Sequence, residues 1–94
     1  MDNGTEVKEY ALYSNYPNPF NPATLITYQL PKDIHVSLVV YNSLGQEIAT
    51  LVSQHQSIGK YSIQFNAVNL PSGIYFYKLQ AGEFSKVNKM LLVR

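Results

Sequence analysis

Apolar and polar residues alternate with a period of two along most of this chain, and this alternation limits the fold more than any other feature. It is clearest in residues 34–41, IHVSLVVY, where one face carries Ile34, Val36, Leu38 and Val40. Gly, Pro, Asn or Ser interrupts the alternation about every ten residues, and no stretch shows sustained helical periodicity. A chain patterned in this way is typical of an all-β sandwich or barrel.

Seven segments are predicted to be strands, with short turns between them. They are residues 7–13, 25–30, 34–41, 46–52, 59–66, 74–80 and 84–93, of which 46–52 alternates poorly and 7–13 reads as an edge strand. Residues 53–58 are predicted to be a polar loop, and Gly45 ends a tight turn in which it can take a positive φ. We therefore predict one domain, folded as a seven-stranded antiparallel sandwich. Further inward residues are predicted to be Ile26, Tyr28, Leu30, Tyr61, Ile63, Phe65, Tyr75, Tyr77 and Leu79.

Composition argues against several classes of function. The chain has 94 residues, a net charge of +1 and no cysteine, so nothing favours nucleic acid or an anionic membrane as a partner, and no disulfide or thiolate metal site is available. No apolar run approaches the length of a membrane span, and the polar N-terminal stretch MDNGTEVKEY is no signal peptide.

No arrangement of side chains predicts catalysis or metal binding. His35 and His55 are far apart in the sequence, each without a cysteine or acidic residue at ligand spacing, and are interpreted as surface histidines. The acidic residues are scattered, each glycine stands alone at a turn, and no nucleophile motif occurs. We therefore expect no enzyme activity, no cofactor and no small-molecule substrate.

The eight tyrosines leave two interpretations open. Tyrosine-rich sandwiches can bind sugars by stacking, and Tyr41, which faces outward in the alternation, is the candidate for such a contact. The inward parity of the other strand tyrosines favours core packing, with their hydroxyls at the rim of the core. These inward tyrosines are Tyr28, Tyr61, Tyr75 and Tyr77.

Residues 16–22, YPNPFNP, form a stiff segment and not a flexible linker. Each proline restricts φ and pushes the preceding residue toward extended geometry. Phe20 is predicted to plug the open end of the sandwich. Its replacement by alanine is then expected to lower the melting temperature by several degrees, on the scale of about 3 kcal/mol.

The last predicted strand contains residues 89–93, KMLLV, which are apolar on both faces. Such a strand either lies between two layers or offers one apolar face to something outside. Lys86, Lys89 and Arg94 have no acidic residue near them in this strand. They fit an edge strand protected against aggregation, or a terminal tag displayed to a receptor.

Three stretches, taken in order, carry a resemblance to a known family: YPNPFNPATLITYQLP, then VSLVVYNSLGQEIATLV, then GKYSIQFNAVNLPSGIYFYKLQAGEFSKVNKMLLVR. The set resembles the type A C-terminal sorting domain of the type IX secretion system of certain Gram-negative bacteria. This resemblance implies an immunoglobulin-like β-sandwich over residues 16–94, at the C-terminus of a larger secreted cargo protein, with residues 1–15 as the tether to the cargo.

The resemblance also implies a route and partners. The cargo passes through the periplasm, and the outer-membrane translocon then recognises the domain and carries the cargo to the cell surface or the medium. A sortase-like surface protease commonly removes the domain, and the cargo is released or attached to an anionic lipopolysaccharide. The cut would fall within residues 1–15, and the domain is a protease substrate and not an enzyme.

Residue by residue, the glycine-x-tyrosine motif of the family falls on Gly73 and Tyr75, and its turn glycine falls on Gly45. The basic-then-aliphatic terminal motif falls on Lys89, Met90, Leu91, Leu92 and Val93. The resemblance implies that the translocon recognises the two strand motifs, and the last strand could dock by adding to a partner's sheet.

Two other accessory modules remain as alternatives. An immunoglobulin-like domain of the flagellar hook-capping type shares the Pro-Asn opening and the terminal strand. It usually carries a tryptophan and an acidic, glycine-rich insertion before Ser-Gly, whereas this chain has FNAVNLPSG and no tryptophan. The second alternative is a carbohydrate-binding or adhesive module that uses outward tyrosines.

Overall fold

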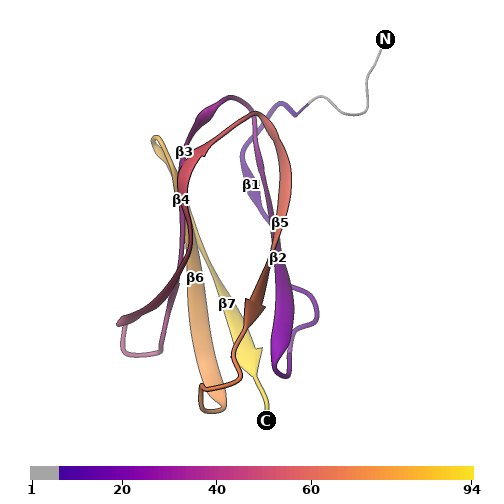
Figure 1. Ribbon diagram of the computed structural model, residues 1–94, viewed down its shortest axis with the longest axis vertical. Coiled ribbons are helices and arrows are strands. Elements are labelled where there is room, and N and C mark those ends of the chain that lie inside the picture. The colour runs from indigo at the N-terminus through magenta and orange to yellow at the C-terminus, as the bar shows by residue number, and fades with distance from the viewer. Residues whose placement is uncertain (1–6) are drawn as a thin grey trace.

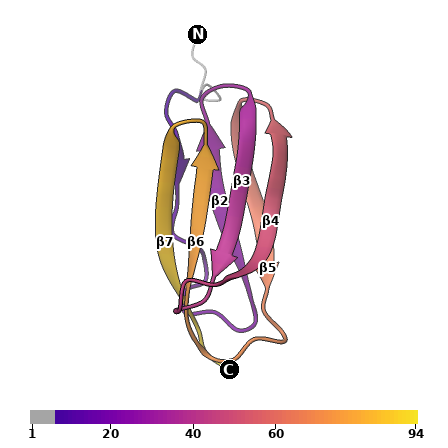
Figure 2. The same cartoon turned by 90° about the vertical axis from the view of Figure 1, so that its left-hand side faces the viewer.

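A computed structural model describes residues 7–94. Two antiparallel sheets pack face to face, which confirms the predicted immunoglobulin-like sandwich (Figures 1 and 2). One sheet has the strand order β1-β2-β5 and the other β4-β3-β6-β7. The described residues contain no helix long and apolar enough to cross a membrane. The strands are β1 (Ala11–Leu12), β2 (Ala23–Leu30), β3 (Ile34–Tyr41), β4 (Glu47–Gln56), β5 (Gly59–Asn66), β6 (Gly73–Ala81) and β7 (Phe84–Leu92).

The predicted alternation decides which side chains enter the core. Ile26, Tyr28 and Leu30 of β2 are fully buried between the sheets. The inner faces of β3 and β6 meet them, because two packed sheets bury their facing side chains together. The side chains that these two strands bury completely are Val36, Leu38, Val40, Tyr77, Leu79 and Ala81.

The fourth strand is longer than predicted. The sequence placed residues 53–58 in a loop, but β4 continues to Gln56, which pairs with Ile34. Main-chain pairing with β3 holds this polar end, because ladder hydrogen bonds do not require apolar side chains. Register shifts between Leu38 and Val39 and between Val40 and Tyr41 also break the period of two on which the prediction relied.

The first strand is shorter than predicted. Of residues 7–13 only Ala11–Leu12 form β1, which pairs with β2. Leu12 is buried, and the Tyr10 ring stacks on Phe84 at a centroid distance of 4.8 Å. The C-terminal part of the predicted tether is therefore packed onto the sandwich. Its first six residues lie outside the described part of the chain.

The inward tyrosines turn their hydroxyls to polar partners at the rim of the core, as predicted for core tyrosines. The hydroxyl of Tyr28 donates to the side chain of Gln56, and that of Tyr77 donates to the carbonyl of Tyr13 at 2.7 Å. Tyr61 is half-buried and stacks on Tyr28 with ring centroids 5.4 Å apart. Core packing is thus the correct interpretation for these rings.

Burial of tyrosine makes the stability of the domain depend on pH. It raises the pKa of Tyr28 to about 12 and also raises the pKa of Tyr77, because the phenolate is poorly solvated in the core. Unfolded tyrosine loses its proton near pH 10, so above that pH the unfolded chain binds fewer protons than the folded domain. The free energy of unfolding should therefore be level below about pH 10 and fall as the pH approaches about 12. Urea unfolding at several pH values measures this loss, and Tyr28→Phe should make it smaller; an equal loss in the variant would exclude Tyr28 as its source.

Candidate recognition surface

Antiparallel pairing of β6 with β7 brings the two predicted recognition motifs together. Gly73 stands opposite Leu92, and Tyr75 stands opposite Met90. Both pairs lie at the end of the sandwich where the C-terminus is found (Figure 1). Two motifs that are separate in the sequence therefore lie side by side.

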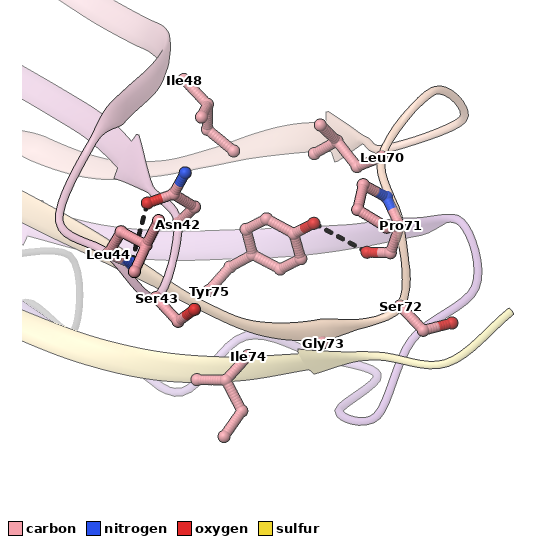
Figure 3. A pocket seen from close by; sticks show the side chains of 10 residues that line it. All are labelled: Asn42, Ser43, Leu44, Ile48, Leu70, Pro71, Ser72, Gly73, Ile74 and Tyr75. Atoms are coloured by element: carbon pink, nitrogen blue, oxygen red, sulfur yellow. Dashed lines mark hydrogen bonds between the residues drawn. The ribbon is translucent and has the colours of Figure 1, made fainter.

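Gly73 and Tyr75 lie in positions that shape this end of the fold. Gly73 begins β6 with a φ of +153°, which other residues rarely adopt. Tyr75 is buried, and its hydroxyl donates to the carbonyl of Pro71 at 2.7 Å (Figure 3). The turn glycine Gly45 takes a φ of +84°, and its amide donates to the carbonyl of Asn42 at 3.0 Å. None of these three residues offers a large side-chain surface to a partner.

The terminal motif divides between the core and the surface. Met90 and Leu92 are fully buried, whereas Lys89, Leu91 and Val93 are exposed. The reason is that successive side chains of β7 point to opposite faces of its sheet, of which one packs on the core and the other faces outward. The sequence left open whether this strand lies between two layers or offers one apolar face to the outside. In the structure, β7 offers an apolar face to the outside.

The outer edge of β7 is occupied by residues 16–22, which we call the proline-rich segment. The amide of Leu91 donates to the Asn18 side-chain oxygen at 3.0 Å, and the carbonyl of Leu91 accepts from the Phe20 amide at 2.9 Å. The Val93 amide donates to the Phe20 carbonyl at 3.0 Å. A partner that added a strand to β7 here would have to displace the proline-rich segment.

Phe20 itself is buried in the core, with 2% of its surface exposed. Its ring lies 6.2 Å from that of Phe65, and its main chain forms a parallel bridge with Leu92. The proline-rich segment thus holds the last strand both through the main chain and through this ring.

Arg94 binds the loop between β5 and β6. Its guanidinium donates to the carbonyls of Ala67 at 2.7 Å, Val68 at 2.8 Å and Leu70 at 3.0 Å, and its amide donates to the Ser72 hydroxyl at 2.9 Å. From the sequence, Arg94 was recognisable only as one of the positive charges near the C-terminus. No side-chain pattern could have revealed these contacts, because the acceptors are main-chain oxygens that every residue carries.

We expect Arg94→Ala to lower the free energy of unfolding by about 1.5–3 kcal/mol, the range for hydrogen bonds made by a charged group. Arg94→Lys should restore only part of the loss, because an ammonium lacks the planar set of donors. Lys86→Ala, which removes an exposed cation from β7, is the matched control and should change little. Urea unfolding measures all three, and an Arg94→Ala variant as stable as the control would contradict the contacts described.

Two shallow hollows lie beside these motifs. One of about 270 Å³ is bordered by the turn that begins at Asn42, by Tyr75 and by the loop before Gly73 (Figure 3). The other, of about 180 Å³, lies on β7. Ile74 borders both hollows and points away from the Tyr75 ring (Figure 3). The second hollow is lined by Asn18, Ile74, Lys89, Met90 and Leu91.

The remaining candidates from the sequence lie elsewhere. His35 and His55 stand opposite each other on β3 and β4, both exposed, a pairing that the sequence analysis missed because it depends on strand register. Within residues 7–94, no three His, Cys, Asp or Glu side chains gather as metal ligands do. Tyr41 is half-buried and pairs across the strands with Phe76.

Comparison with known proteins agrees with the resemblance noted above. Among curated protein sequences, none matches this chain. A family model described as the secretion system C-terminal sorting domain matches residues 14–93. The matched region runs from just before the proline-rich segment to the end of the terminal motif, so it includes the proline-rich segment, β6 and β7. The chain therefore belongs to the family of C-terminal sorting domains of the type IX secretion system.

Proposed function

We propose that this domain directs a larger cargo protein across the outer membrane through the type IX translocon, and that the translocon recognises the end of the sandwich built by β6, β7 and the proline-rich segment. The membership of the family carries this proposal, because it covers nearly the whole fold. The exposed residues of the terminal motif support recognition at this end of the sandwich. Lys89, Leu91 and Val93 face outward, whereas Met90 and Leu92 belong to the core.

The motif residues divide into two proposed roles. Gly73, Tyr75, Met90 and Leu92 hold the strands in place, since they are buried or take a glycine conformation. The three exposed residues of the terminal motif are the ones that a translocon protein can contact.

The packing of residues 10–15 supports a proposal for the position of the protease cut. Proteases need exposed, extended chain. Leu12 and Asn15 are buried and Tyr10 packs on Phe84, so residues 10–15 are tied to the sandwich at these points. We therefore propose that a sortase-like protease removes the domain by cutting N-terminal to Tyr10, within the first part of the tether.

Export of a fused reporter tests the function. The whole 94-residue chain is joined to the C-terminus of a reporter that carries an ordinary signal peptide, in a host with the type IX translocon. We expect the reporter at the cell surface or in the medium, and in the periplasm when the translocon is deleted. A reporter that stays in the periplasm of the intact host would contradict the sorting function.

A further inference from the structure

The outward face of the β6–β7 hairpin carries an apolar patch next to the proline-rich segment. Ile74 and Leu91 stand opposite each other across the two strands, and they are 42% and 38% exposed. Both point away from the core and line the hollow of about 180 Å³, with Asn18 and Lys89 around it. We call these four residues the composite surface, because they come from three separate segments of the chain.

A partner cannot form main-chain hydrogen bonds with β7 beside the composite surface. Around Leu91, both main-chain groups that point outward are already hydrogen-bonded, one to the Asn18 side chain and one to the Phe20 amide. The Lys89 carbonyl also accepts from the side-chain amide of Asn18 at 3.5 Å. What remains for a partner at the composite surface is the set of side chains.

Charge indicates what kind of partner fits. The outward face of the two strands carries Lys78 and Lys89, and neither Gly73–Ala81 nor Phe84–Leu92 contains an acidic residue. Complementary potential favours a partner that brings negative charge to such a surface. An apolar side chain of the partner would fill the hollow and exclude water from it, as interface anchors do.

We propose that the composite surface is recognised in the folded domain, through side chains, by a protein partner that places an apolar side chain in the hollow and a carboxylate beside Lys89. This inference rests on the proposed sorting function and names the mode of recognition: the partner reads a folded surface and adds no strand to β7. Asn18 has two roles in it, since it lines the hollow and also closes the edge of β7.

Matched substitutions on β7 test the surface. Leu91→Asp should lower export of the fused reporter at least about tenfold, because the partner's apolar anchor would meet a charge. Val87→Asp is the control, since Val87 lies on the same strand and the same outward face and is 52% exposed. Lys89→Glu and Lys86→Glu form a second pair. Lys89→Glu should lower export, because Lys89 lines the hollow, whereas Lys86→Glu should leave export unchanged. All four purified variants should melt close to the wild type.

Asn18→Ala separates side-chain recognition from strand addition, because the two modes predict opposite results. Removing the Asn18 side chain frees the Leu91 amide, so strand addition would become easier and export would stay level or rise. Recognition of the composite surface predicts lower export. Asp33→Ala is the control, since Asp33 likewise accepts one main-chain amide, that of Ile58 at 2.8 Å, away from this surface.

The outcomes distinguish this inference from the function on which it rests. If the wild-type fusion is not exported, the sorting function fails. If the wild type is exported and both β7 pairs behave alike, the function stands and the composite surface is wrong. Level or higher export of Asn18→Ala would overturn recognition of a closed edge in favour of strand addition.

Discussion

Replacing Phe20 with alanine is expected to lower the free energy of unfolding by about 3 kcal/mol or more, as for other buried phenylalanines. The ring is 2% exposed and packs near Phe65, so its removal leaves a cavity at the end of the core. For a domain of this size, each 1 kcal/mol shifts the melting temperature by about 4–8 °C. A fall of more than about 10 °C is therefore expected.

Tyr16→Ala provides the control for this measurement. Tyr16 belongs to the same proline-rich segment and is also aromatic, but it is 79% exposed. Its removal should change the free energy of unfolding by no more than about 0.5 kcal/mol, as for most surface substitutions. Thermal unfolding followed by circular dichroism compares the two variants. Equal melting temperatures would show that the Phe20 ring does not support the core.

Removing residues 89–94 is expected to unfold the domain. The deletion takes Met90 and Leu92 from the core, where both are fully buried, and each such loss costs about 2–5 kcal/mol. It also removes the main-chain partners of Phe20 and the contacts of Arg94. Because the whole stability of a small domain is about 5–15 kcal/mol, little is left to keep the sandwich folded. Circular dichroism and resistance to protease measure the result.

A triple variant with serine in place of Lys89, Leu91 and Val93 is the matched control for the deletion. It changes only exposed side chains of the terminal motif and keeps Met90 and Leu92. We expect it to stay folded and resist protease. A deletion that melts as cooperatively as this control would contradict the structural role of the last strand.

The comparison also decides how export experiments should be interpreted. Loss of export after deletion of residues 89–94 would follow from unfolding alone, even if no partner contacted the strand. Loss of export in the folded triple variant would instead point to recognition of its outward face. Substitutions of exposed residues are therefore the informative test of sorting.

The sequence predicted most strands well, and its two errors have physical causes. The alternation of β2, β3 and β6 follows from burying one face of a sheet, so the inward residues could be identified before the structure was seen. The end of β4 is polar and is held by main-chain pairing with β3, so it carries no apolar signal. Only two residues of the predicted first strand pair with β2, because pairing there depends on a neighbouring strand and not on local pattern.

By itself, the sequence determined the class of fold, the faces of the strands and, through ordered motifs, the family. The tertiary structure alone decided how the last strand is held, with Phe20 and Asn18 on its outer edge and Arg94 on the loop beside it. These contacts join residues about seventy positions apart or use main-chain carbonyls as acceptors. Every residue except proline offers the same main-chain donor and acceptor, so no side-chain pattern marks which of these groups will meet. Only the tertiary structure therefore decided which residues of the terminal motif are buried in the core and which are exposed to a partner.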